Sequence, residues 1–424
     1  MRVGIYNRWL ETMGGGEQHL GAIAQSLAPT HQVELIAHAR VNIAELERRL
    51  GLNLTGVTMR VVPDTPRFAS IAEASADYDF FLNASHLDYF PARGRQNALL
   101  VYFPAASIGH AQALNTYNRA KRLAVQTVVR LIGSHGRQIL RKVVFGSGGR
   151  SSEQSMFGRV ALGTFRAVTD NSQQEKILNS YQLILTNSAF TQRWIRHYWN
   201  RESFVLFPPV NIDQFAPGIK GSWILSVGRF FAGNHNKKHV EMIRAFRSAA
   251  SGALATWEYH LAGGFVSTES NAVYLAAVQK EASADPRIHL HVNCSLTELR
   301  QLYAQSKLFW HAAGFGEDEE AHPERVEHFG ITTVEAMAAG CVPLAVSKGG
   351  QPEIIRSPDE GILWTTLSQL VEQSEILATD EGRREQVAQA ALARAQDFGP
   401  WAFEERLAYA LEQLGISGVA RAGH

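Results

Sequence analysis

The stretch from Glu327 to Glu353 constrains the fold more than any other part of this 424-residue chain. Apolar residues after Gly330 recur at intervals of three and four, which predicts a short helix over Ile331–Ala339 that ends at Gly340. Cys341–Val346 is a nearly continuous apolar run, as in a buried parallel strand. A glycine pair, Gly349 and Gly350, then predicts a turn that leads the chain back toward the start of the helix. The stretch therefore predicts helix, buried strand and glycine turn, the repeating unit of an α/β domain.

The start of this helix is a candidate anion site. Gly330 leaves the backbone bare, and three amides without intrahelical partners follow it, those of Ile331, Thr332 and Thr333. Glu327 and Glu335 lie on either side of the helix start, separated by seven residues. A diphosphate at the helix end would lie between two carboxylates, one facing a sugar and one placed to accept hydrogen bonds from ribose hydroxyls. The alternative is an ordinary helix with two surface glutamates.

The complete pattern resembles a known family. It reads EHFG-x-x-x-VEAMAAG-x-x-P and is followed by GG-x-PE. In this form it resembles the donor-site signature of the retaining family-4 glycosyltransferases, and within them the branch that includes the dolichol-linked oligosaccharide mannosyltransferases and bacterial relatives. The resemblance implies a GT-B fold, in which two Rossmann-like doubly wound α/β domains face a cleft. It also implies transfer of a sugar from a nucleoside diphosphate sugar, with no metal and no cofactor required.

The same resemblance implies roles for individual residues. Glu327 would face the sugar ring and support the cationic anomeric carbon, and Glu335 would hold the ribose. Arg229 directly follows the predicted strand Trp223–Gly228, at the strand end where open α/β sheets bind ligands. Lys237 falls on the family's phosphate-binding lysine, with Lys238 in place of the usual small residue. These cations would neutralise the departing diphosphate; the alternative is two surface bases near a turn.

Two glycine loops complete the candidate site. Gly15 and Gly16 stand between a first strand, Arg2–Tyr6, and a helix, and in the family such a loop touches the diphosphate or the acceptor. The alternative is a tight strand-to-helix turn. Gly263 ends a later strand in the manner of the family's nucleotide-facing loop. The sequence departs from the family pattern at Tyr102, where related first domains often carry a histidine. A role of that histidine does not carry over to Tyr102, and His86 and His110 can be named only as substitutes for it.

Composition limits the class of protein. The hydrophobic content of 45% is ample for the cores of two or three domains, and a net charge of +1 argues against general nucleic-acid binding. The two cysteines, Cys294 and Cys341, lie in apolar segments and are expected to be reduced, which fits a cytoplasmic protein. We recognise no signal peptide, and no window reaches the roughly 18 apolar residues of a membrane span.

The segment from Tyr89 to Ser152 contains no acidic residue. Apolar residues between its basic ones suggest amphipathic helices suited to an anionic membrane surface or a lipid-phosphate acceptor. A solvated basic face on a helical subdomain is the alternative. The basic residues are Arg93, Arg95, Arg119, Lys121, Arg122, Arg130, Arg137, Arg141, Lys142 and Arg150.

We therefore expect an acceptor domain over residues 1–208 with a basic insertion at about 105–175, a nucleotide-sugar domain over 209–398, and a helix and tail over 399–424 that return to the first domain. The donor would be a GDP, UDP or ADP sugar, and the acceptor would be a glycan, a lipid-linked sugar or a small molecule. If the insertion binds lipid, the protein would lie at the inner face of the membrane. A GT-B epimerase or hydrolase acting on a nucleotide sugar and a non-catalytic membrane-surface adaptor remain as rivals.

Overall fold

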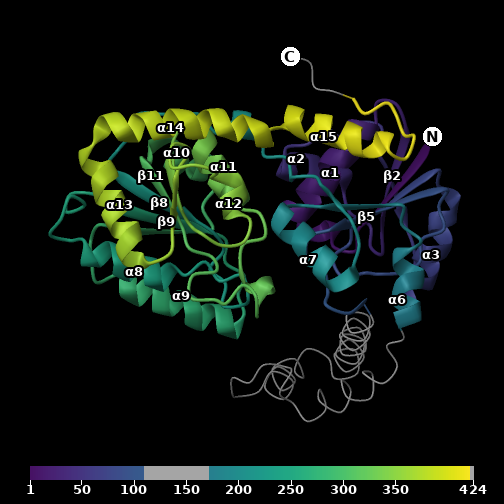
Figure 1. Cartoon of the computed structure of the whole chain (residues 1–424), viewed down its shortest axis with the longest axis horizontal. Coiled ribbons are helices and arrows are strands. Elements are labelled where there is room, and N and C mark those ends of the chain that lie inside the picture. Colours follow the sequence, from purple (N-terminus) through teal and green to yellow (C-terminus); the bar gives the residue numbers. More distant parts are fainter. Residues whose placement is uncertain (109–170, 421–424) are drawn as a thin grey trace, which may run out of the picture.

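The computed structural model describes residues 1–108 and 171–420 of the chain. They form two α/β domains side by side, each built on a parallel sheet covered by helices (Figure 1). The predicted GT-B architecture of two Rossmann-like domains is confirmed.

The first domain holds a seven-stranded sheet in the order β3-β2-β1-β4-β5-β6-β7. Because β2 and β4 flank β1, the strand order reverses beside β1, and such switch points open a crevice at the carboxyl ends of the strands. The strands are β1 (Arg2–Tyr6), β2 (Gln32–Ala37), β3 (Thr58–Val61), β4 (Phe80–Asn83), β5 (Gln96–Val101), β6 (Leu183–Thr186) and β7 (Phe204–Val205). The helices are α1 (Gly15–Leu27), α2 (Ile43–Leu50), α3 (Ala69–Ala74), α6 (Asn171–Leu178) and α7 (Ala189–Trp199).

The second domain holds a six-stranded sheet in the order β10-β9-β8-β11-β12-β13. Its strands are β8 (Trp223–Val227), β9 (Glu258–Gly263), β10 (Ile288–Val292), β11 (Leu308–His311), β12 (Val342–Val346) and β13 (Ile362–Trp364). Its helices are α8 (His239–Ser248), α9 (Glu269–Ala282), α10 (Leu296–Gln305), α11 (Ile331–Ala338), α12 (Gln351–Ile354), α13 (Leu367–Thr379) and α14 (Glu381–Ala395). β12 is buried along its whole length, as its continuous apolar run predicts.

The first sheet ends in a strand of only two residues, β7, directly before the chain passes to the second domain. Phe204 and Val205 pair with Leu185 and Thr186 as an edge strand of the first sheet. Two residues are too few for a periodic hydrophobic signal, so the pairing depends on the neighbouring strand.

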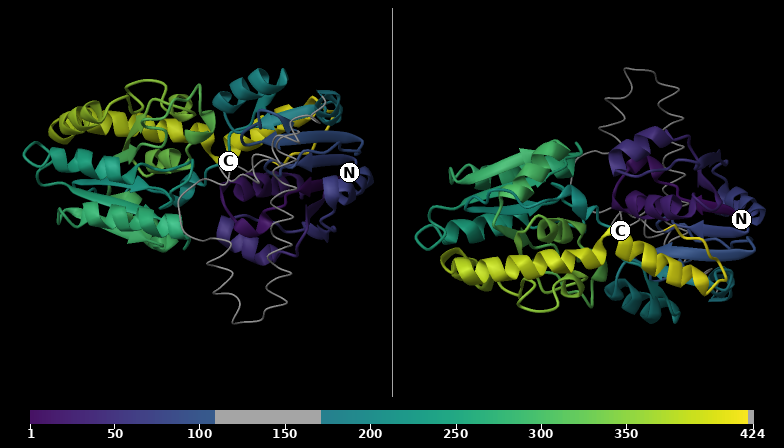
Figure 2. Two further views of the ribbon diagram at one scale, coloured as in Figure 1. Left: turned by 90° about the horizontal axis from the view of Figure 1, so that it is seen from below. Right: turned by 90° about the horizontal axis from the view of Figure 1, so that it is seen from above.

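The last helix crosses from one domain to the other. α14 lies on the second domain, and α15 (Pro400–Glu412) continues across to the first (Figures 1 and 2). Phe403, Leu407 and Leu411 of α15 are buried in the core that α1 and β1 of the first domain also form. This apolar burial anchors the end of the chain, which comes from the second domain, in the core of the first.

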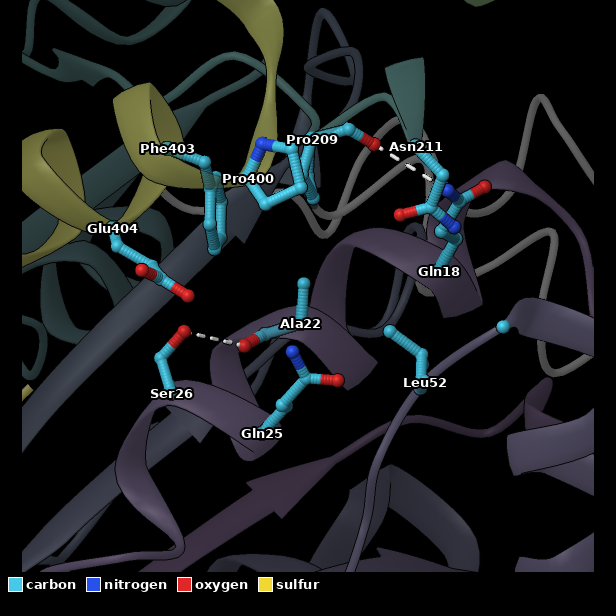
Figure 3. A pocket seen from close by; sticks show the side chains of 11 residues that line it. Gln18, Ala22, Gln25, Ser26, Leu52, Pro209, Asn211, Pro400, Phe403 and Glu404 are labelled. Carbon is cyan, nitrogen blue, oxygen red and sulfur yellow. Dashed lines mark hydrogen bonds between the residues drawn. The ribbon is translucent and has the colours of Figure 1, made fainter. Parts of the chain in front are cut away.

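A small cavity lies where α1, Pro209 to Asn211 and the start of α15 meet. Its volume is about 30 Å3, and it is lined by Gln18, Ala22, Pro209, Asn211, Pro400 and Phe403 among others (Figure 3). The amide of the Gln18 side chain donates to the Pro209 carbonyl at 3.4 Å. Room for only about one or two water molecules means that this junction is closely packed.

Among the helices of the described ranges, none has the length and apolarity needed to cross a bilayer. Most of the predicted basic insertion, including His110, lies outside the described residues.

Candidate active site

The start of α11 is built around Gly330. Its φ of 121° is one that side chains rarely adopt, and a Cβ there would lie 2.1 Å from Nε2 of Gln351. Gln351 donates to the Phe329 carbonyl at 3.1 Å and accepts from Thr333 Oγ1 at 2.8 Å. The glutamine therefore fixes the turn that leads into the helix.

Of the three helix-end amides predicted to bind an anion, two have no acceptor within the described residues. The Thr333 amide differs from the prediction, because it donates to the Gly330 carbonyl at 3.0 Å. The amides of Ile331 and Thr332 donate to no protein acceptor within residues 1–108 and 171–420. The helix end thus keeps two donors for an anion.

Glu327 lies directly before this helix end, in contact with two other side chains. Its carboxylate forms an ion pair with Lys237 and lies 3.3 Å from Nε2 of His311, which is buried at the end of β11. Burial alone would raise the pKa of Glu327, but the Lys237 charge and the His311 hydrogen bond hold that pKa well below its ordinary value. Glu327 is therefore an anion at neutral pH.

Of the basic side chains near the helix end, Lys237 and Lys238 form ion pairs with carboxylates, and Arg229 does not within the described residues. Lys238, with a left-handed φ of 57° before α8, pairs with Glu317 at 2.7 Å and so points toward the loop after β11. Arg229 is exposed, stacks over the Phe231 ring with 5.4 Å from Cζ to the ring centroid, and forms no ion pair in the described part of the chain. Arg229 can therefore bind an anion without first breaking a salt bridge.

Glu335 lies on the second turn of α11, where one carboxylate oxygen accepts from the Tyr303 hydroxyl at 2.7 Å. Burial raises the pKa of Glu335 to about 7. Sequence reasoning did not find Tyr303, which lies on α10, and no local signal links it to Glu335.

The glycine loops bring backbones together. A Cβ on Gly263 would lie 1.9 Å from the Gly228 carbonyl oxygen, so only glycine lets the ends of β8 and β9 approach this closely. The prediction that Gly15 and Gly16 lie in a loop before the first helix is wrong, because α1 already begins at Gly15. Across the cleft, a Cβ on Gly15 would lie 3.1 Å from Cδ1 of Ile331, which places the start of α1 against the start of α11. The Tyr102 hydroxyl donates to the Gly16 carbonyl at 2.7 Å, so Tyr102 supports the first turn of α1.

The two domains contact each other through residues that the sequence reasoning did not assign. Glu353, the glutamate of GG-x-PE, accepts hydrogen bonds from the Ala189 and Phe190 amides at the start of α7, at 2.6 and 2.7 Å. Phe103 stacks on His328 with ring centroids 4.3 Å apart. The signal that could have revealed Glu353 is its fixed place in the motif, but its partner is 164 residues away in the sequence.

Histidines of both domains meet beside Glu327. The His235 and His328 rings lie 5.0 Å apart, and burial together with His235 and His86 lowers the pKa of His328 to about 3. Desolvation within the cleft and the nearby His235 also lower the pKa of His86, although the His86 side chain keeps exposed surface. His86, which follows β4, thus approaches the site from the first domain.

Asp77 and Asp79, formally a D-x-D, lie away from this site. Asp77 pairs with Arg60 at 2.8 Å, and Asp79 accepts from the Arg2 amide at 2.8 Å, at the amino end of the sheet. Both carboxylates therefore lie at the end of the first sheet opposite the candidate site.

With this geometry in place, comparison with known proteins identifies the second domain. Residues 210–394 match the family described as Glycosyl transferases group 1. Over these residues the chain resembles a glycosyltransferase group 1 domain. That domain holds Arg229, Lys237, Glu327 and Glu335, so the predicted resemblance to family-4 glycosyltransferases is confirmed.

Relatives and solved structures agree with this assignment. The chain is 26% identical over 226 residues to a GDP-Man:Man(3)GlcNAc(2)-PP-Dol alpha-1,2-mannosyltransferase of Dictyostelium discoideum, covering 49% of this chain and 42% of the relative. The human protein of the same name is 24% identical over 252 residues, covering 55% and 48%. The chain thus spans about half the length of these relatives. HepE of Anabaena in complex with UDP-glucose shares the fold along 97% of this chain and 100% of its own, with a TM-score of 0.63 and 15% identity.

Proposed function

We propose that this chain transfers a sugar from a nucleoside diphosphate sugar to a glycan, lipid-linked or small-molecule acceptor, with retention of configuration. The observation that carries the proposal is the Glu327 carboxylate, held as an anion by Lys237 and His311 beside the two unused amides of α11. The domain family is that of glycosyltransferases.

In this proposal the leaving diphosphate occupies the helix end. Charge develops on the diphosphate as the glycosidic bond breaks, and preorganised cations stabilise it best in that state. Arg229 is free to contact it, and Lys237 would exchange part of its pairing with Glu327 for the phosphate. Glu327 would then face the cationic anomeric carbon, which favours an anion at that position.

The acceptor would enter across the first domain. The start of α1 at Gly15, Tyr102 and His86 lie on this side, opposite α11. The names of the mannosyltransferase relatives include a dolichol-linked oligosaccharide, which supports a lipid-linked acceptor. With such an acceptor, the chain would work at the inner face of a membrane. The basic insertion would then contact anionic lipid.

The nucleotide is the first thing to test. The relatives' names favour GDP, and the HepE complex favours UDP. A thermal-shift screen of the purified chain against GDP, UDP and ADP should raise the melting temperature with one of them, since a hundredfold excess over Kd stabilises by about 2.7 kcal/mol. Failure of all three to shift the transition would contradict the proposed donor site.

A GT-B nucleotide-sugar hydrolase or epimerase would share the donor pocket. Release of nucleoside diphosphate should therefore be measured with the matching sugar donor, with and without acceptor glycan. Transfer predicts that acceptor accelerates release and that the product keeps the anomeric configuration of the donor. Equal release without acceptor would favour the hydrolase, and donor isomerisation would favour the epimerase. Binding without any turnover would favour the adaptor.

A further inference from the structure

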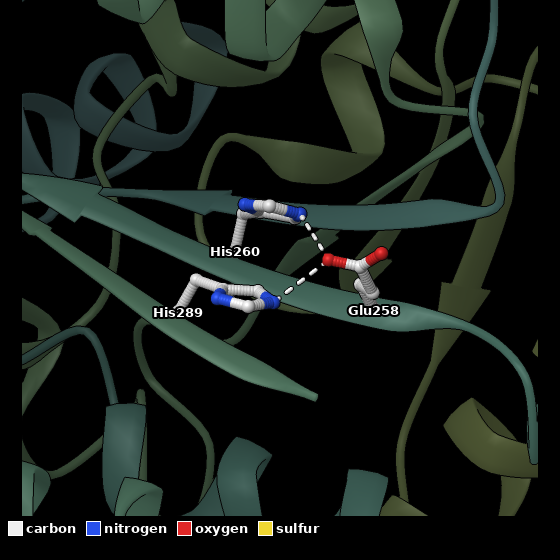
Figure 4. Close-up of side chains that lie close together, drawn as sticks. All are labelled: Glu258, His260 and His289. Carbon is white, nitrogen blue, oxygen red and sulfur yellow. Dashed lines mark ion pairs between the residues drawn. The ribbon is translucent and has the colours of Figure 1, made fainter. Parts of the chain in front are cut away.

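A second group of ionisable side chains lies on the second sheet, away from the cleft. Glu258 and His260 are two residues apart on β9 and therefore lie on the same face of the sheet. His289, on the edge strand β10, pairs with His260 in the parallel register (Figure 4). Glu258 begins β9, and His289 is the second residue of β10. The group therefore lies toward the amino ends of these strands, whereas the Gly263 loop and the donor site lie at the carboxyl ends.

The three side chains converge on one point. Nε2 of His289 and Nε2 of His260 lie 2.7 and 3.7 Å from the same Glu258 oxygen, Oε2. The three atoms all lie within 4.8 Å of one another. Ligand atoms of a tetrahedral ion with bonds of about 2.0–2.1 Å are roughly 3.4 Å apart, and the two distances bracket that value.

His260 is held in one orientation by a chain of hydrogen bonds. Its Nδ1 lies 3.1 Å from Nε2 of His291, and Nδ1 of His291 lies 3.1 Å from a Glu298 oxygen on α10. The Trp223 ring packs against His260 with centroids 4.2 Å apart. Such a carboxylate–imidazole support is the arrangement that orients histidine ligands of metal ions.

Nε2 of His260 is the atom of this group that most needs a partner. It is buried and has no hydrogen-bond partner within the described residues, and His260 as a whole is only 5% exposed. The nearest carboxylate oxygen, Oε2 of Glu258, lies 3.7 Å away, which is beyond hydrogen-bond distance. A buried nitrogen without a partner costs free energy, and a cation held between this nitrogen and the carboxylate would remove that cost.

We propose that Glu258, His260 and His289 bind a divalent transition-metal ion of the Zn2+ class, with the fourth position left to water or a small ligand. Two imidazoles and one carboxylate are a ligand set that suits Zn2+. Because β10 is the edge strand, the ion would bind it to β9 and stabilise that side of the domain. The site would serve the fold or its regulation, since it is remote from Glu327.

The test uses the full chain, stripped of metal and titrated with Zn2+ against a chromophoric chelator. We expect one tight site whose affinity falls at least about tenfold to a hundredfold in His289→Ala and in Glu258→Gln. Both side chains are partly exposed, at 39% and 43%, so neither change should prevent folding. The matched control is His322→Ala, which removes an exposed histidine beside Glu324 and should leave Zn2+ affinity unchanged.

Thermal unfolding supplies a second readout. Zn2+ should raise the melting temperature of the unmodified chain and of His322→Ala, but not of His289→Ala. Nucleotide-induced shifts should persist in His289→Ala, so a missing donor site and a missing metal site are distinguishable. Absence of tight Zn2+ binding in the unmodified chain, or binding that survives in both ligand variants, would overturn the proposal.

Discussion

Replacing Lys237 with alanine should reduce both turnover and stability, whereas replacing Arg229 should reduce turnover alone. Lys237 is paired with Glu327, and each side chain is only about one-fifth exposed, at 19% and 20%. Arg229 is exposed and has no ion pair in the described ranges. Both residues would stabilise the diphosphate, but only the replacement of Lys237 should also destabilise the fold.

The magnitudes follow from the two environments. Loss of one preorganised charge from a developing anion costs on the order of a hundredfold in turnover, or about 2.7 kcal/mol of barrier. Removing one partner of a fully buried pair costs about 3–5 kcal/mol, and the remaining exposure of Glu327 reduces this to roughly 2–3 kcal/mol. A change of that size lowers the melting temperature by roughly 4–12 °C in a domain of this size. For Arg229→Ala the expected change is within about 0.5 kcal/mol.

The double variant Lys237→Ala/Glu327→Gln separates the two effects. Without the unpaired carboxylate, stability should recover while turnover stays low. Since Lys237 holds the Glu327 pKa low, the pair stabilises the fold above the ordinary carboxyl pKa of about 4.3, and this contribution is lost as pH falls. The assays are thermal unfolding at pH 7 and pH 4 and transfer rates with a matched donor. Equal stability of Lys237→Ala and Arg229→Ala at pH 7 would refute the reasoning.

Further predictions concern the ribose, the glycine contact, metal dependence and the insertion. Burial raises the pKa of Glu335 to about 7, so nucleotide affinity should rise roughly tenfold as pH increases through 7, and Glu335→Gln should abolish that dependence. The stability that protonated Glu335 contributes should be complete below the ordinary carboxyl pKa of about 4.3 and should be lost as pH rises from there to about 7. Gly263→Ala should destabilise by about 1–3 kcal/mol in denaturant titrations, while Gly56→Ala, where a Cβ meets no atom within 4 Å, tests the cost of positive φ alone. Chelation by EDTA should leave the transfer rate unchanged, because the helix end and cations already balance the diphosphate, and loss of activity with rescue by a divalent ion would contradict this. Liposome co-sedimentation should be stronger with anionic than zwitterionic vesicles and should weaken at high salt, and a chain that stays in the supernatant at low salt would exclude the membrane contact.

The sequence by itself determined the local elements and their class. Periodicity of 3.6 predicted α11 to within one residue, and the apolar run before Ser347 predicted β12 in the same way. The first strand was likewise predicted as Arg2–Tyr6, with the bounds that the structure has. The need for glycine at position 330 was also visible, since it follows from the backbone of a few adjacent residues. These features depend on neighbours in the chain, so a linear pattern contains them.

Only the tertiary structure decided which side chains meet. Nothing in the linear pattern pairs Glu353 with the start of α7, or places Tyr303 on Glu335. The alternation of Glu258 and His260 was a visible period of two, but its meaning depended on β10 standing beside β9 in a register that brings His289 to the same point. Such contacts join residues tens to hundreds of positions apart, and packing of whole elements sets their geometry. Local propensity and periodicity carry no information about that packing.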